Sequence, residues 1–391
     1  MNELTPIGEL DRRIEKLKSR LNSEGIDGAL LVQAIDVFYF SGTRQNGVLW
    51  MPVAGTPILL LRKSFTRGRE ESGLEDVRPL ASAKELPSVV GTHTKRIGVT
   101  MDVLPVHYLN FYQKLLPNAE FVDISAICRN LRSVKSEWEL TQMRMSGQLL
   151  AEAFGQIPEF LVPGMRELDF SAEFEYRLRK TGVGGFLRIR GFNQELTGIA
   201  TSGRNIAAPG CFDGPVTGAG FWSAAPYGAS LEVIGTDVPI FVDYGSFYNG
   251  YHADMTRIFC FGKLAPELTR AFDLSCEIQS WLSENCSPGR ICEELFTHAA
   301  EMAAMAKPNG FFMGNNEEGA KFVGHGLGLE LDELPIIAPK FSTPLQAGQT
   351  LALEPKFLFP GKGVVGIENT FAITEHGCKN LTPLSDAVVL L

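Results

Sequence analysis

Several features that would assign this chain to a membrane, export or nucleic-acid class are missing. It has no apolar run near the roughly 18 residues that cross a bilayer, and runs such as PILLL at 57–61 have the length of a buried strand. Its first residues are polar and charged, unlike a secretory signal. The net charge is −9 and the basic residues are scattered, which argues against nucleic-acid binding. We therefore expect a soluble, cytoplasmic protein without a membrane or nucleic-acid partner.

Cysteine pairs and repeats are also lacking. The seven cysteines are widely spaced and include no CxxC pair, so we expect reduced thiols without a function. We see no long internal repeat and no low-complexity tract. A hydrophobic fraction of 45% is ordinary for a globular core.

The 391 residues suggest about two domains. In the first part a helical stripe over residues 8–24 is followed by short apolar runs at 29–32, 37–40, 48–52 and 57–61. This alternation of helices and short strands predicts a three-layer α/β domain over residues 1–130. Residues 131–391 are predicted to form the second domain. Because this larger domain combines long helices with strand patterns, the predicted class of the chain is α+β.

Two long helices are predicted in the second domain, among segments with strand patterns. One runs from about Ser136 to Phe154, because Ser136 and Glu139 have the spacing of a capping box. The other runs from Pro266 to Glu284, with Pro266 in its first turn and an apolar stripe along one face.

Two carboxylates stand symmetrically in a predicted hairpin. Residues 238–246 and 251–259 have strand patterns, and Asn249-Gly250 lies in the turn between them. A four-residue loop at 247–250 would place Asp243 directly opposite Asp254, with Cβ atoms about 5 Å apart. Two like charges so close repel each other unless a cation lies between them.

The same arrangement recurs near the C-terminus. Residues 349–358 and 364–373 have strand patterns, and Glu354 and Glu368 are equidistant from the loop that joins them. Both lie among apolar residues, where unpaired carboxylates are costly. Either hairpin alone could carry two ordinary exposed acids, but the pair of hairpins favours a metal site. His325, in FVGHGLGLE between glycines, is a fifth candidate ligand.

These residues, in the order Asp, Asp, His, Glu, Glu, resemble the methionine aminopeptidase, aminopeptidase P and prolidase family of pita-bread metallopeptidases. The matching stretches are FVDYGSFYNGYHADMTR, GHGLGLELDE, LEPKF and GIENT, within residues 137–391. A weaker resemblance to the creatinase/prolidase N-terminal domain covers RIEKLKSRLNSEGIDGALL, FYFSG and the linker RSVKSEWEL.

The resemblance implies two divalent metal ions, held by Asp243, Asp254, His325, Glu354 and Glu368. Asp254 and Glu368 would bridge the ions, and His325 and Glu354 would each cap one. An oxygen-rich set with one histidine suits manganese, cobalt or iron(II), with zinc also allowed. The ions would activate a bridging water, with Glu354 as the catalytic proton acceptor. The family also commonly forms homodimers.

The sequence departs from the family's pattern at four positions. Gly210, after SGRNIAAP, and Asp332, in LELDE, replace histidines that contact substrate in the peptidases. Gly366 replaces an arginine common before the last glutamate, and Lys356 stands where a glycine is usual.

Other residues are candidates for substrate binding. Arg188 and Arg190 would share one strand face and could hold a substrate carboxylate, or pair with acids such as Glu195. Asp332 and Lys356 are further candidates; Lys356 would either face the metals or lie at a solvated loop edge. His252 is expected to be structural or to support a ligand. Tyr39 either lines the cleft or packs in the core, and His93, His107, His298 and His376 are expected at the surface.

Three functions remain open. The first is an Xaa-Pro aminopeptidase or dipeptidase acting on small peptides. The second is a metal-dependent enzyme of the same fold with a non-peptide substrate, as an amide hydrolase or lyase, which Gly210 and Asp332 favour. The third is a non-catalytic binding module, which five intact ligands argue against.

Overall fold

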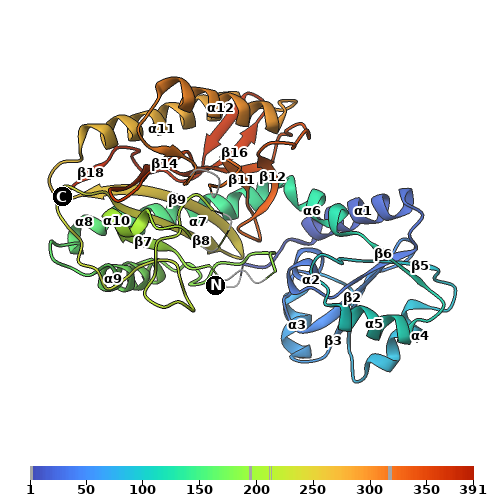
Figure 1. Cartoon of the computed structure of the whole chain (residues 1–391). Coiled ribbons are helices and arrows are strands. Elements are labelled where there is room, and N and C mark those ends of the chain that lie inside the picture. The colour runs from blue at the N-terminus through green and yellow to red at the C-terminus, as the bar shows by residue number, and fades with distance from the viewer. Residues whose placement is uncertain (1–2, 193–195, 211, 213, 316–318) are drawn as a thin grey trace. The chain divides into compact units, whose positions relative to one another are not determined.

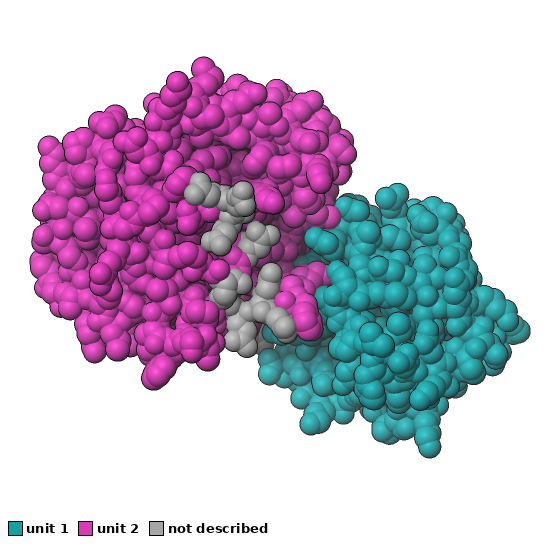
Figure 2. Space-filling model, in the orientation of Figure 1, with its two compact units in different colours: residues 1–132 teal, residues 133–391 magenta. Residues whose placement is uncertain are grey.

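The computed structural model describes residues 3–192, 196–210, 212, 214–315 and 319–391. The chain divides into two compact units, residues 1–132 and 133–391 (Figures 1 and 2). Within the described ranges, no helix is long and apolar enough to cross a membrane.

Unit 1 alternates helices with short strands. Its elements are α1 (Ile7–Ser23), β1 (Gly28–Leu31), α2 (Ala34–Ser41), β2 (Gly47–Pro52), β3 (Ile58–Leu61), α3 (Phe65–Glu71), β4 (Asp76–Pro79), a 3-10 turn (Ala83–Glu85), α4 (Leu86–Val90), β5 (Arg96–Val99), α5 (Val106–Leu115), β6 (Glu120–Asp123) and α6 (Ser125–Ser133).

The strands of unit 1 form one mixed sheet in the order β4-β3-β2-β1-β5-β6. Leu30 of β1 and Trp50 of β2 belong to a core that also contains Leu86 of α4 and Tyr112 of α5. Helix α1 contacts β1 and β2, and its stripe is buried at Leu17 among others. Helices thus pack on the sheet as the predicted three-layer α/β arrangement requires.

One predicted strand in unit 1 is wrong. The apolar run Val37–Phe40 lies in helix α2, which ends at Gly42 in a left-handed conformation. The helix starts because the Gln33 side chain accepts hydrogen bonds from the backbone N–H groups of Ile35 and Asp36. A four-residue apolar run is compatible with either a buried helix or a strand. Here the Gln33 cap favours the helix.

Unit 2 contains the remaining elements. They are α7 (Glu137–Gly155), α8 (Ile157–Phe160), α9 (Glu167–Lys180), β7 (Ile199–Ser202), α10 (Gly203–Ile206), β8 (Ile240–Tyr248), β9 (Tyr251–Cys260), α11 (Pro266–Asn285), α12 (Cys292–Ala306), β10 (Phe311–Phe312), β11 (Gly324–Gly326), β12 (Glu333–Ile337), β13 (Thr350–Leu353), β14 (Lys356–Phe359), β15 (Gly363–Gly366), β16 (Asn369–Thr374), β17 (Gly377–Asn380) and β18 (Val389–Leu390).

Unit 2 has two halves, each with helices outside and strands inside (Figure 1). In one half α7 and α9 contact the sheet β18-β9-β8-β7. In the other, α11 and α12 contact the strands of the sheets β10-β14-β15 and β12-β11-β13-β16-β17. Each half has its own apolar core. This is the predicted pita-bread arrangement, in which the inner strands of both halves meet.

Both predicted long helices of unit 2 are confirmed. Ser136 accepts a hydrogen bond from the backbone of Glu139, whose side chain bonds back to Ser136 and completes the capping box of α7. Pro266 is the first residue of α11. These local signals fix the helices that support the inner strands from outside.

The two halves are joined by polar contacts of Arg257 on β9. Its buried guanidinium donates to the backbone carbonyl of Glu368 and to the Asn369 side chain, across the boundary between the sheets. Thr256, next to it, forms a backbone bridge with Glu368. Strand β9 therefore holds the last glutamate of the predicted ligand set in place.

Candidate metal centre

The first pair of acids lies on one face of the β8–β9 hairpin, but with a different register from the one predicted. Tyr248 pairs with Tyr251, so the loop has two residues rather than four. Asn249 and Gly250 have positive φ values of 47° and 89°, as a tight hairpin turn requires. Asp243 consequently pairs with Thr256, and Asp254 with Gly245, which makes the two aspartates diagonal neighbours instead of direct partners.

The second pair of acids is opposed as predicted, although each strand is interrupted at its glutamate. Leu353 pairs with Asn369 on one side and Lys356 with Gly366 on the other, so Glu354 lies opposite Glu368. The first strand divides into β13 and β14 around Glu354-Pro355, and the second into β15 and β16 around Ile367-Glu368. Proline has no N–H to donate to a neighbouring strand, which explains the break after Glu354. The two glutamates therefore lie at the boundary between the sheet that contains β13 and β16 and the sheet that contains β14 and β15.

His325 enters from β11, between β12 and β13. A Cβ atom on Gly324 would lie 2.6 Å from the carbonyl oxygen of Ala352, and one on Gly326 would lie 2.2 Å from that of Leu334. Glycine at both positions therefore lets β11 approach its neighbours. The Nδ1 atom of His325 lies 3.1 Å from the Gly326 carbonyl, which can accept a hydrogen bond from Nδ1–H, so that the Nε2 lone pair is directed at the acids.

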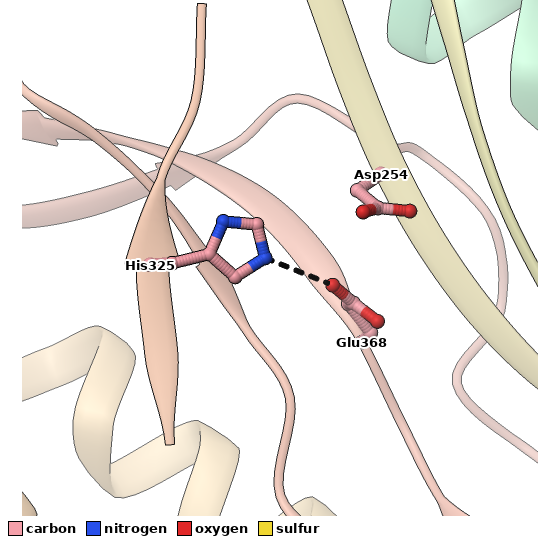
Figure 3. Close-up of side chains that lie close together, drawn as sticks. All are labelled: Asp254, His325 and Glu368. Carbon is pink, nitrogen blue, oxygen red and sulfur yellow. Dashed lines mark ion pairs between the residues drawn. The ribbon is translucent and has the colours of Figure 1, made fainter. Parts of the chain in front are cut away.

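Asp254, His325 and Glu368 form a group suited to a metal ion (Figure 3). All three are buried, and one ligand atom from each lies within 4.8 Å of the others. His325 Nε2 is 3.9 Å from Glu368 Oε1 and 3.6 Å from Glu354 Oε1, too far for hydrogen bonds. An imidazole and carboxylates with a gap between them match the hard, oxygen-rich sites of divalent ions, so these residues fit the metal that the sequence predicts.

Burial and mutual repulsion raise the pKa values of three of the acids in the site. Burial, opposed by Lys356 and reinforced by the charge of Glu368, raises the pKa of Asp243 to about 6. Burial and the charges of Glu368 and Asp243 raise the pKa of Asp254 well above its usual value. Burial also raises the pKa of Glu368, although Lys356 acts against it. A cation among these carboxylates would reverse these shifts.

Lys356 is buried inside the site rather than at a solvated loop edge. Its Nζ lies 3.0 Å from Asp243 Oδ2, 2.6 Å from Glu354 Oε2 and 2.8 Å from Glu368 Oε2. Burial opposes the charged form, but the three carboxylates outweigh it and raise the pKa of Lys356 well above its usual value. The lysine predicted as a possible substrate contact is thus held by three predicted metal ligands.

A cavity opens onto the acids, and its walls are mostly apolar. The five predicted ligands, Asp332 and Lys356 line it together with Leu187, Ile189, Leu196, Ile199, Phe212, Pro215, Val216, Phe322 and Leu331. Among the described lining residues, Lys356 is the only lysine or arginine.

Arg188 and Arg190 are not among the residues that line the cavity, and of the two roles left open for them the structure favours pairing within the protein. Their neighbours Leu187 and Ile189 line the cavity instead. Arg188 donates to the backbone carbonyl of Leu329, and Arg190 lies 3.6 Å from the Glu330 carboxylate. The alternation of side chains holds, but the segment is irregular rather than a strand, and its apolar side faces inward. The alternative partner Glu195 lies outside the described residues.

The other departures from the family's pattern lie in different places. Asp332 is half exposed at the cavity, with Oδ1 3.3 Å from His325 Nδ1. Gly210 is outside the residues that line this cavity, and a Cβ there would collide with Thr217. Gly366 is the cross-strand partner of Lys356, and a Cβ on it would lie 2.7 Å from Lys356 Cγ. Gly366 therefore makes the room in which the lysine side chain lies.

The remaining histidines lie where they were expected, and of the two roles left open for Tyr39 the structure supports packing in the core. His252 is fully buried and bonds through Nδ1 to the Gly328 carbonyl at 2.9 Å. His93, His107, His298 and His376 are exposed. Tyr39 is buried beneath the Arg13 guanidinium, which lies 4.1 Å from its ring centroid.

Two threonines that orient the acids were not among the residues predicted from the sequence. Thr256 Oγ1 donates to Glu368 Oε2 at 2.9 Å. Thr370 Oγ1 accepts from the Asp254 N–H at 2.8 Å and donates to the Asp254 carbonyl at 2.9 Å. Thr256 follows Asp254 by two residues, and Thr370 follows Glu368 by two. Residues two apart in an extended strand share a face, so this spacing could have identified both threonines as neighbours of the acids.

Comparison with known proteins agrees with this site. Residues 141–375 match metallopeptidase family M24, and residues 13–134 match the creatinase/prolidase N-terminal domain. An Xaa-Pro dipeptidase of Pyrococcus furiosus is 26% identical over 378 residues, covering 95% of this chain and 98% of that protein.

Solved structures show the same fold. An Xaa-Pro dipeptidase from Bacillus anthracis superposes with a TM-score of 0.83 at 23% identity, covering 98% of this chain and 100% of that one. An X-Pro aminopeptidase from Thermotoga maritima gives 0.80 at 23% identity, covering 97% and 99%. The chain belongs to metallopeptidase family M24, with a creatinase/prolidase N-terminal domain.

Proposed function

We propose that this protein is a metal-dependent hydrolase that cleaves the peptide bond before proline in small peptides. The observation that carries the proposal is the convergence of Asp254, His325 and Glu368 at the end of an apolar cavity, in a chain of family M24. Relatives over nearly the whole length are named Xaa-Pro dipeptidases. This favours a peptide over the non-peptide substrate that Gly210 and Asp332 suggested.

The residues of the site have separate tasks in this proposal. A bound divalent ion would lower the pKa of water and polarise the scissile carbonyl. Glu354 lines the cavity and is the proposed acceptor of the water's proton, and a hydrogen bond from Lys356 to Oε2 holds its carboxylate in place. Phe212, Phe322 and Leu331 offer an apolar surface to the proline ring and exclude bulk water from the reacting bond.

The charge of the cavity bears on the choice between aminopeptidase and dipeptidase. Of its described lining residues only Lys356 is a lysine or arginine, and its ammonium is already bound to three carboxylates. A free C-terminal carboxylate on the proline would lie near these acids without a cation. We therefore propose that peptides extended beyond proline are cleaved faster than Xaa-Pro dipeptides.

The test is hydrolysis by metal-free protein reloaded separately with manganese, cobalt, iron(II) or zinc. The substrates are Xaa-Pro dipeptides and matched peptides extended beyond proline, with Xaa-Ala peptides for comparison. We expect metal-dependent cleavage before proline that Asp254→Asn abolishes and Asp273→Asn, at an exposed position of α11, leaves unchanged. Metal binding without cleavage of any peptide would refute the proposed peptidase activity and favour an enzyme of the same fold with a non-peptide substrate. The homodimer and the cytoplasmic location stay predictions.

A further inference from the structure

The ammonium of Lys356 binds carboxylate oxygens that a second metal ion would need as ligands. Its ammonium is within 3.0 Å of one oxygen each of Asp243, Glu354 and Glu368. Asp243 and Glu368 are the two of these that would hold an ion on the side away from His325. An ammonium bound to the same oxygens competes with such an ion for space and for lone pairs.

Glu368 has no lone pair left on that side. Its Oε2 accepts one hydrogen bond from Lys356 Nζ at 2.8 Å and another from Thr256 Oγ1 at 2.9 Å. A carboxylate oxygen has two lone pairs, so both are used. Glu368 therefore cannot bridge two ions through Oε2 while Lys356 and Thr256 hold it.

The lysine side chain is enclosed and cannot withdraw into solvent without repacking. It is 2% exposed, and its ammonium lies 5.7 Å from the centroid of the Phe241 ring. Its stem crosses Gly366 on the facing strand, where any larger side chain would collide with it. The ammonium is thus built into the strand pair β14–β15.

The opposite side of Glu368 is open to one ion. Its Oε1 faces His325 Nε2 across 3.9 Å, and Glu354 Oε1 lies 3.6 Å from the same nitrogen (Figure 3 shows His325 and Glu368 with Asp254). Asp254 completes the group. The described residues therefore contain a ligand set for one ion that does not need Asp243.

We propose that the site holds a single divalent ion, bound by Asp254, His325, Glu354 and Glu368, and that the Lys356 ammonium takes the place of a second. This rests on the proposed metal-dependent function. Asp243 then pairs with the lysine and is not a metal ligand. One divalent ion and one ammonium supply three positive charges against the four carboxylates, so the buried charge is nearly balanced without a second ion.

The first measurement is the metal content of the full-length protein after stripping with chelator and separate reloading with manganese, cobalt, iron(II) or zinc, by elemental mass spectrometry and calorimetric titration. We expect one ion per chain in the wild type and in Lys362→Gly, which alters an exposed lysine in the β14–β15 turn. Lys356→Gly should bind two. Electron paramagnetic resonance adds an independent readout, because a lone manganese(II) and a pair about 3.5–4 Å apart give different spectra.

Two aspartate variants keep the proposal falsifiable if Lys356→Gly does not fold. Asp243→Asn should retain one ion with a Kd within about threefold of the wild type, whereas Asp254→Asn should lose it by at least a hundredfold. Two ions in the wild type, loss of an ion in Asp243→Asn, or one ion in folded Lys356→Gly would each overturn the proposal. No binding of any of the four metals would instead overturn the metal-dependent function itself.

Discussion

Replacing Lys356 by methionine tests how far this ammonium holds the site together. Methionine matches the apolar stem of lysine but lacks the ammonium, so the change removes the charge and the hydrogen-bond donors that three carboxylates share. Breaking a buried ion pair on one side costs about 3–5 kcal/mol. We expect the free energy of unfolding of the metal-free protein at pH 8 to fall by that amount.

The pH dependence of this cost has a definite sign. The pKa of Asp243, raised to about 6 by burial, rises further without the lysine, and a carboxylate with a raised pKa stabilises the fold only while protonated. Stability of the variant is therefore lost as pH rises through this range, and the difference from the wild type shrinks towards pH 5.

The assay is urea unfolding in chelator, followed by tryptophan fluorescence. Three of the four tryptophans, Trp138, Trp222 and Trp281, lie in unit 2, so the signal reports mainly on the unit that contains the site. Lys362→Met, which breaks an exposed pair with Glu267, is the matched control and should cost less than about 1 kcal/mol. A cost below about 1 kcal/mol for Lys356→Met, or an equal cost at pH 5 and pH 8, would refute the reasoning.

Asp243, Thr256 and Phe322 each allow a separate test of the site. In the metal-free wild type, the rise of the Asp243 pKa from 3.8 to about 6 should lower the free energy of unfolding by about 2 kcal/mol as the pH rises from 4 to 7. Asp243→Asn should flatten this fall of stability in chelator, and an unchanged fall would assign it to another group. Thr256→Val removes a buried hydroxyl donor to Glu368 and should lower the free energy of unfolding by about 1–3 kcal/mol, measured beside Thr269→Val on the exposed side of α11. Phe322→Ala removes part of the apolar cavity wall and should raise KM for Xaa-Pro peptides about tenfold, the effect of roughly 1–3 kcal/mol of lost apolar contact; a loss confined to kcat would contradict a role in binding.

Much of the scaffold was predictable because its signals are local. The capping box at Ser136 and Glu139 and the proline at the start of α11 each act within a few residues. The run Val37–Phe40 was assigned wrongly because its conformation depends on the Gln33 side chain rather than on its own apolarity. Short buried segments lack the length that would reveal their period.

The order of the acids was predictable, but their mutual geometry was only partly so. Glu354 and Glu368 oppose each other as their symmetry about the loop implied. Asp243 and Asp254 do not, because the Asn249-Gly250 turn has two residues and shifts the pairing by two. The choice between a two-residue and a four-residue loop depends on positive φ values at two positions, which the sequence permits but does not require.

The sequence did not reveal which side chains of the irregular segment 187–190 face the cavity. Arg188 and Arg190 alternate with Leu187 and Ile189, and either pair was free to face the cavity. The arginines bond instead to Leu329 and Glu330, which the sequence places some 140 residues away. Only the tertiary fold brings these partners together, so no periodicity within the segment could have selected the correct face.

Lys356 and Gly366 are best understood together. Lys356 stands where glycine is usual in the family's pattern, and Gly366 stands where arginine is common. The structure makes them a cross-strand pair in which the glycine provides the space that the lysine stem fills. The positive charge of Lys356 lies on β14 and reaches three acids. An arginine at position 366 alone would collide with the Lys356 stem. The Lys356→Gly, Gly366→Arg double variant should therefore have a higher free energy of unfolding than Gly366→Arg by itself.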